Sequence, residues 1–186
     1  LASNGRHYRR EWFGTACCPA NIARLVASLG DYIYGTSDGA LWVNLYVGST
    51  TNLKVGKNTV AVKMQTEYPW DGKIRLELDP STKTKLAIRL RIPGFVSGQV
   101  VPGDLYFFED SRPEPYQILL NGKPVLWKVE GGYAVVTREW RKGDVLELNL
   151  PLTVKRVVAR PELKQDFDRV ALQRGPLVYC VEGADN

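Results

Sequence analysis

The sequence predicts an all-β fold, an antiparallel and jelly-roll-like β-sandwich preceded by one short helical segment. Three observations predict it. Apolar residues alternate with polar ones along most of the chain beyond residue 36. The alternating stretches are separated by glycine and proline, of which the chain has 17 and 11. Its 186 residues, 44% of them hydrophobic and 24% charged, have an ordinary globular composition and can bury a core without disulfides.

One stretch near the N-terminus has helical spacing, from Pro19 to Tyr34. Its apolar residues recur every three or four positions, at Ile22, Leu25, Val26, Leu29 and Ile33. Pro19 suits the first helical position, which makes Cys18 the predicted N-cap. Gly30 interrupts the pattern and is expected to weaken or end the helix.

Short alternating runs follow to the end of the chain and predict about ten strands. They include 41–47, 59–65, 74–79, 133–137, 146–152, 154–158, 169–173 and 177–182. Asn121-Gly122 lies between two further apolar runs, 118–120 and 125–127, and predicts a tight hairpin turn. The stretch 94–115 has three prolines and three glycines and predicts a long surface loop.

The helical stretch and the β-rich stretch are not expected to be equivalent as domains. A helix of about sixteen residues cannot form a domain alone. It either packs on the sandwich or belongs to a helical domain whose remainder lies outside this sequence. We therefore expect residues 1–36 to be one part and residues 37–186 to be the β-sandwich domain.

The net charge of +5 does not form a basic patch. Lys83, Lys85, Arg89 and Arg91 alternate with apolar residues, which is typical of the solvated face of one strand. No apolar run approaches the roughly 18 residues of a membrane span. We expect neither a nucleic acid nor a membrane as a partner.

The three cysteines carry the candidate chemistry, because the chain has a single histidine. Cys17 and Cys18 are adjacent, and neighbouring Cα atoms about 3.8 Å apart are too close for a relaxed disulfide. Two buried small hydrophobes are one interpretation. The other follows from their place at a helix N-terminus, which favours the thiolate that a nucleophile or a soft-metal ligand needs.

A zinc ion would need four ligands, and the chain supplies few. His7 is nearby in sequence, but a lone histidine is more often a surface residue. Cys180 lies in an apolar run that predicts a buried strand, so we expect it in the core. Half of a zinc site is therefore plausible within these residues, and a complete one is not expected.

The run Tyr68-Pro69-Trp70-Asp71-Gly72 predicts a turn between strands. Its functional alternative is an aromatic shelf for a sugar, with Tyr68 and Trp70 facing outward. Phosphate-binding glycine loops and the common hydrolase motifs are absent from the sequence.

Several motifs together resemble one family. They are the stretch 12–25 with its Cys17-Cys18-Pro19-Ala20-Asn21 core, then 29–34, 43–46, 68–72, 89–94 and 174–180. In this order they resemble glycoside hydrolase family 127, the β-L-arabinofuranosidase-type enzymes. The resemblance covers nearly the whole chain.

The resemblance implies a catalytic (α/α)6 barrel followed by β-sandwich domains, with residues 1–36 as the C-terminal end of the barrel. Cys17 would be the nucleophile, and Cys17 and Cys18 would bind zinc. The other zinc ligands, a glutamate and a third cysteine, and the glutamate acid/base would lie upstream of this sequence. No substrate contact is assigned, and His7 and Trp12 are candidates.

The implied parent enzyme releases β-L-arabinofuranose with retained configuration. Its partners would be an arabinose-containing oligosaccharide or glycan and the N-terminal helical barrel. We expect this chain alone to hold no stable zinc and to be inactive. Free adjacent thiols suit a reducing interior or a metal-protected site outside it, so cytoplasm and periplasm both fit.

The alternative function belongs to another class, a non-catalytic carbohydrate-binding or structural β-sandwich module. In that case exposed aromatic side chains would stack on sugars. The candidates are Trp42, Tyr46, Trp70 and Trp127.

Overall fold

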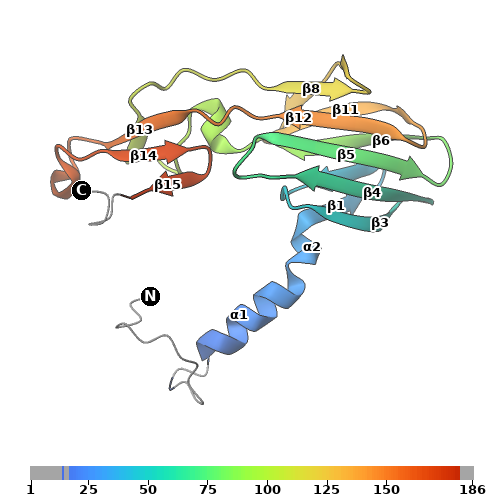
Figure 1. Ribbon diagram of the computed structural model, residues 1–186, viewed down its shortest axis with the longest axis horizontal. Coiled ribbons are helices and arrows are strands. Elements are labelled where there is room, and N and C mark those ends of the chain that lie inside the picture. Colours follow the sequence, from blue (N-terminus) through green and yellow to red (C-terminus); the bar gives the residue numbers. More distant parts are fainter. Residues whose placement is uncertain (1–13, 15–16, 181–186) are drawn as a thin grey trace. The chain divides into compact units, whose positions relative to one another are not determined.

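The computed structural model describes Gly14 and residues 17–180 (Figure 1). The chain divides into two compact units between Tyr32 and Ile33. In the first unit, α1 spans Cys17–Ser28, and α2 spans Gly30–Ile33 across the boundary. The break expected at Gly30 lies one residue earlier, at Leu29, because α1 ends at Ser28 and Gly30 is the first residue of α2.

The start and end of the helical stretch differ from the prediction. Helix α1 begins at Cys17, so Cys18 is inside the first turn rather than its N-cap. Pro19 is tolerated there because the first N–H groups of a helix have no intrahelical partner. Tyr34, predicted to be helical, begins strand β1 instead.

The described residues of the second unit form three sheets. Sheet A has the order β1 (Tyr34–Ser37), β2 (Ala40–Val43), β6 (Thr84–Arg91), β11 (Tyr133–Trp140), β10 (Lys128–Glu130). Sheet B has the order β3 (Ser49–Val55), β4 (Asn58–Thr66), β5 (Lys73–Pro80), β12 (Asp144–Asn149), β8 (Gln117–Leu120), β9 (Lys123–Pro124). Sheet C has the order β15 (Leu177–Tyr179), β14 (Ala171–Arg174), β13 (Val154–Ala159), β7 (Tyr106–Phe108).

Among the strands of residues 17–180, the pairs are antiparallel except β2 with β6, so the prediction of a mostly antiparallel, all-β body is confirmed. The jelly-roll-like connectivity stays a prediction. Two short 3₁₀ helices, Gly94–Ser97 and Lys164–Asp166, complete the elements of the described residues.

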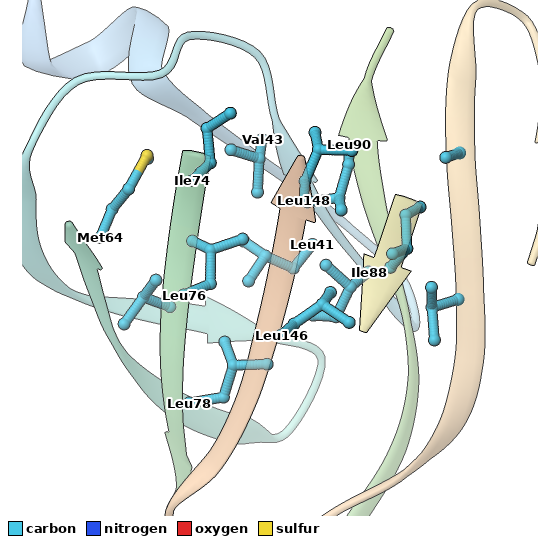
Figure 2. Close-up of a cluster of buried hydrophobic side chains, with 14 of the residues drawn as sticks. Leu41, Val43, Met64, Ile74, Leu76, Leu78, Ile88, Leu90, Leu146 and Leu148 are labelled. Carbon is cyan, nitrogen blue, oxygen red and sulfur yellow. The ribbon is translucent and has the colours of Figure 1, made fainter. Parts of the chain in front are cut away.

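Sheets A and B share one hydrophobic core (Figure 2). On β12, Leu146 pairs with Leu76 of β5, and Leu148 pairs with Ile74. Their side chains meet Leu41, Val43, Ile88 and Leu90 from sheet A. Each fully buried aliphatic side chain of this kind stabilises the fold by about 1.5–3 kcal/mol. The period-two pattern read along the sequence therefore identifies the faces of the sandwich.

The turn at Asn121-Gly122 is confirmed. Both residues have positive φ, 50° and 76°, the backbone that a two-residue hairpin turn of the favoured type requires. The Asn121 side chain also fixes the turn to β12, because its Nδ2 donates to Asp144 Oδ1 at 2.9 Å and its Oδ1 accepts from the Val145 N–H at 2.8 Å.

The stretch 94–115 is not only a surface loop as predicted. It contains the first 3₁₀ helix and strand β7, which pairs with β13 at Val157–Phe108. The last strands, β13 to β15, therefore form sheet C with β7 instead of joining the two sheets of the sandwich. Strand β7 was not predicted, because three residues are too few to show the alternation of apolar and polar residues that marks a strand.

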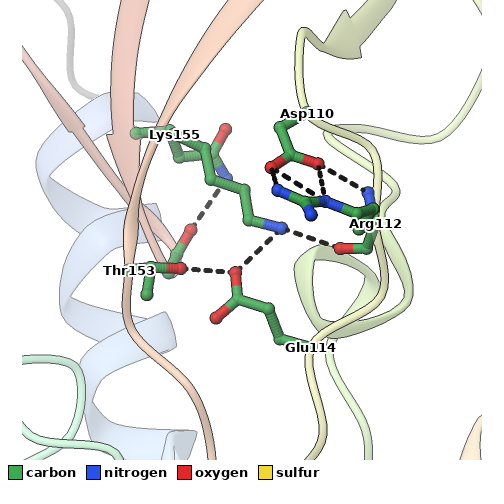
Figure 3. Close-up of polar contacts among 7 residues, drawn as sticks. Asp110, Arg112, Glu114, Thr153 and Lys155 are labelled. Carbon is green, nitrogen blue, oxygen red and sulfur yellow. Dashed lines mark hydrogen bonds and ion pairs between the residues drawn. The ribbon is translucent and has the colours of Figure 1, made fainter.

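Two chain segments connect sheet C to sheet B, residues 109–116 from β7 to β8 and residues 150–153 from β12 to β13. A polar cluster joins them (Figure 3). Lys155 Nζ lies 2.8 Å from Glu114 Oε1 and donates to the Arg112 carbonyl at 3.2 Å, and the Thr153 hydroxyl donates to Glu114. The cluster thus holds sheet C against the end of the sandwich.

Candidate active site

The two adjacent cysteines lie in the first turn of α1 with their sulfurs facing each other. The distance from Cys17 Sγ to Cys18 Sγ is 3.6 Å, and both side chains are exposed. Exposure contradicts the interpretation of the pair as two buried small hydrophobes. The sulfurs are not bonded, because a disulfide requires an S–S distance of about 2.05 Å.

The backbone of this turn is braced by a side chain whose role was not predicted from the sequence. Asn21 Nδ2 donates to the Cys17 carbonyl at 2.8 Å, and Asn21 Oδ1 accepts from Arg24 Nη1 at 3.3 Å. Residues four apart on a helix are neighbours, so the four-residue spacing from Cys17 to Asn21 could have predicted this hydrogen bond.

The pair fits part of a metal site. Two thiolates on one tetrahedral zinc, each with a Zn–S bond of about 2.3 Å, lie about 3.8 Å apart. The observed 3.6 Å between the sulfurs is close to that separation. Within the part of the chain that the structure describes, no group of three or more His, Cys, Asp or Glu side chains could hold a metal. The cysteines therefore match half of a zinc site.

The remaining candidates near the pair, His7 and Trp12, lie outside the described residues. Cys180 belongs to the second unit and is exposed, so its predicted place in the core is wrong. The reason is that β15 is an edge strand ending at Tyr179, one residue before Cys180.

Two of the four aromatic candidates for sugar stacking are engaged in the fold. Tyr46 is 5% exposed, and its hydroxyl donates to the Arg91 carbonyl. Burial raises the pKa of Tyr46 above its usual value. The face of Trp42 is covered by the Arg89 guanidinium, 4.5 Å from the ring centroid. Neither ring is free to stack on a sugar.

The other two aromatic candidates, Trp127 and Trp70, differ in how exposed they are. Trp127 is 37% exposed and packs on the Tyr116 ring, with the centroids 4.9 Å apart. Trp70 is 66% exposed, the largest value among the four. The stacking surface expected from four aromatics is thus reduced to Trp70, with a partial contribution from Trp127.

The turn that carries Trp70 is confirmed, and it is closely held. Asp71 Oδ1 accepts from the Lys73 N–H at 2.9 Å, and the Arg174 guanidinium donates to the Trp70 carbonyl at 3.1 Å. Tyr68 does not face outward as the shelf would require, because its ring packs against Tyr46 at a centroid distance of 5.7 Å.

Lys83, which precedes β6, and Lys85 and Arg91 on β6 are exposed, as the alternation predicted, whereas Arg89 is only partly exposed. Two of this group are ion-paired, Lys83 with Glu139 at 2.6 Å and Arg89 with Glu130 at 3.1 Å. The absence of a nucleic-acid partner stays a prediction. Among the described residues, no helix has the length and apolar character needed to cross a bilayer.

Comparison with known families matches the two parts of the β-rich unit separately. Residues 40–152 match the β-L-arabinofuranosidase, GH127 middle domain, and residues 154–186 match the glycoside hydrolase family 127 C-terminal domain. The first match alone covers more than half of the chain. The chain belongs to glycoside hydrolase family 127.

Relatives in the family are similar along almost the whole chain. A non-reducing end β-L-arabinofuranosidase of Bifidobacterium longum subsp. longum is 37% identical over 96% of this chain and 25% of that protein. A solved GH127 β-arabinofuranosidase has a TM-score of 0.88 and 41% identity, over 97% of this chain and 28% of the other.

A GH127 β-L-arabinofuranosidase from Geobacillus stearothermophilus has a TM-score of 0.80 and 38% identity, over 96% of this chain and 26% of the other. The chain therefore spans about a quarter of the length of its family 127 relatives.

The family boundary between the two matched domains does not separate the sheets. Strand β7 lies in the middle-domain match, yet it pairs with β13 of the C-terminal match. In this chain the two family 127 domains thus share sheet C.

Proposed function

We propose that the chain is the C-terminal portion of a retaining glycoside hydrolase that releases β-L-arabinofuranose with Cys17 as nucleophile. The observation that carries the proposal is the pair of exposed thiols, 3.6 Å apart at the start of α1, in a chain of family 127. Residues 1–36 are then the end of the helical catalytic barrel, and residues 37–186 are its jelly-roll-like sandwich portion.

The Cys17 sulfur is the nucleophile in the first step of the proposed reaction and the leaving group in the second. Cys17 Sγ attacks the anomeric carbon while a glutamic acid outside this sequence protonates the leaving oxygen. A thioglycoside forms on Cys17, and water activated by the same glutamate then releases the sugar with retained configuration. Two inversions at the anomeric carbon account for the retention.

Zinc, held by Cys17, Cys18 and ligands outside this sequence, would keep the thiol deprotonated at neutral pH. Asn21 contributes by holding the Cys17 carbonyl, so that the first turn of α1 keeps the nucleophile in place. Without the acid/base and the remaining ligands, the 186-residue chain is expected to bind zinc weakly and to be inactive.

The test uses the full-length protein and aryl β-L-arabinofuranoside. Cys17→Ser should abolish turnover, and Cys180→Ser is the matched control because Cys180 lies in the other unit. The wild type should bind about one zinc per chain. Turnover of Cys17→Ser at the wild-type rate would refute the assignment.

The second candidate function is a non-catalytic carbohydrate-binding module, and the 66% exposure of Trp70 is the observation that favours it. Titration of the 186-residue chain with arabinan oligosaccharides separates the two. Saturable binding that Trp70→Ala removes would support the module. The expected result is no saturable binding.

A further inference from the structure

The geometry of the two thiols defines a chelating pair rather than two independent groups. Neighbouring side chains on a helix diverge, yet the Cys17 and Cys18 sulfurs approach to 3.6 Å. Both cysteines are exposed, and neither forms a disulfide. The Asn21 brace on the Cys17 carbonyl at 2.8 Å fixes the backbone between them.

The pair cannot close on itself without strain, because adjacent Cα atoms lie about 3.8 Å apart and a relaxed disulfide needs at least about 4.4 Å. A single thiophilic atom placed between the sulfurs avoids this problem, since the sulfurs can stay at their present separation. Soft thiolate ligands select soft atoms.

We propose that Cys17 and Cys18 form a binding site for trivalent arsenic compounds of the arsonous acid class. The site stands on the thiol geometry alone, so it does not depend on the glycosidase proposal. It would make the chain a target of arsenite-type poisons at the residues that the proposed reaction uses.

The reaction balances without an oxidant or reductant. An organoarsenic(III) oxide exchanges its oxygen for the two sulfurs, so that two S–H bonds break and two As–S bonds form. The oxide oxygen leaves with the two thiol protons as one molecule of water, and arsenic stays trivalent throughout.

Cys180 provides an internal comparison. It is an exposed free cysteine in the other unit, and its neighbours in sequence are Tyr179 and Val181, so it has no adjacent thiol. A single thiol forms a labile adduct, whereas two linked thiols gain the advantage of intramolecular closure, typically 10²–10⁴-fold in affinity.

The experiment treats the metal-free 186-residue chain with phenylarsine oxide and follows adducts by native mass spectrometry. We expect one phenylarsenic group per chain, stable to excess 2-mercaptoethanol and removed by 2,3-dimercaptopropanol. Cys17→Ser and Cys18→Ser should each weaken binding about 100-fold or more. Cys180→Ser should bind as the wild type does.

An adduct that survives in Cys17→Ser or Cys18→Ser, or that disappears in Cys180→Ser, would overturn the proposal. A second measurement tests preorganisation. In denaturing urea the affinity should fall about tenfold, because the two side chains must then be ordered on binding. Equal affinity in urea would show that the start of α1 plays no part, which contradicts the proposed site.

Discussion

Lys155→Met should lower the free energy of unfolding by removing the charge at the centre of the cluster in Figure 3. Lys155 Nζ lies 2.8 Å from Glu114 Oε1 and 3.2 Å from the Arg112 carbonyl it donates to. Methionine keeps most of the apolar stem, so the variant removes these polar contacts and the cation–π contact with the Phe108 ring at 5.2 Å.

The magnitude follows from the burial of the pair. The Lys155 and Glu114 side chains are 13% and 23% exposed, so solvent screens them only in part. Hydrogen bonds to charged groups contribute about 1.5–3 kcal/mol. We therefore expect a loss of about 2 kcal/mol, which in a chain of this size lowers Tm by about 4–8 °C.

The effect should depend on pH in a defined direction. Burial raises the pKa of Glu114, but hydrogen bonds from Lys155 and Thr153 outweigh it and hold the pKa below its usual value. A carboxyl with a depressed folded-state pKa stabilises the fold above its unfolded pKa of about 4.3. That contribution is lost as the pH falls through the folded-state pKa.

The assay is urea unfolding at pH 7 and at the lowest pH where the chain stays folded, for Lys155→Met, Glu114→Gln and the double variant. A coupling free energy should appear at pH 7 and shrink in acid. Arg112→Met is the matched control, since its side-chain pair with Asp110 is largely exposed, and it should leave stability unchanged. Additive single variants at pH 7 would refute the reasoning.

Three further predictions concern packing and the surface. Gly72→Ala should destabilise the fold by more than about 3 kcal/mol or prevent folding, because a Cβ there would lie 2.0 Å from the Leu150 carbonyl oxygen. The control is Gly48→Ala, where the nearest atom to an added Cβ is 3.9 Å away, and this variant should have the same unfolding free energy as the wild type. Leu146→Ala should lower the free energy of unfolding by about 2–5 kcal/mol in chemical denaturation, since Leu146 is fully buried; a loss below about 1 kcal/mol would contradict the described core. Trp70→Ala should leave Tm unchanged in thermal unfolding, given its 66% exposure; a marked drop would show that the side chain is packed.

The faces of the sandwich could be predicted from the sequence because one rule covers them. Apolar residues on alternate positions, such as Leu146 and Leu148, must face one core. The turn at Asn121-Gly122 was equally accessible, because few residues tolerate two successive positive φ values. In both cases the information is local in sequence.

The parts that could not be predicted depend on distant contacts. Strand β7 exists because Phe107 and Phe108 pair with β13, about 50 residues later, and three residues carry no period of their own. Cys180 was placed in the core by its apolar neighbours, but its exposure follows from β15 being at the edge of sheet C.

The candidate site was located by sequence and only partly described by it. The adjacency of Cys17 and Cys18 pointed to thiol chemistry, yet the 3.6 Å approach of the sulfurs needed the structure. The four aromatic candidates could not be sorted from sequence, because whether a ring is covered depends on partners such as Arg89 over Trp42.

The central claim is that Cys17 is the nucleophile of a retaining glycosidase. The most direct measurement is mass spectrometry of the acid-quenched full-length enzyme during turnover of an activated β-L-arabinofuranoside. The account predicts a pentosyl group on the proteolytic peptide that contains Cys17, and its absence in Cys17→Ser. A pentosyl group on another residue, or turnover with inverted configuration, would contradict it.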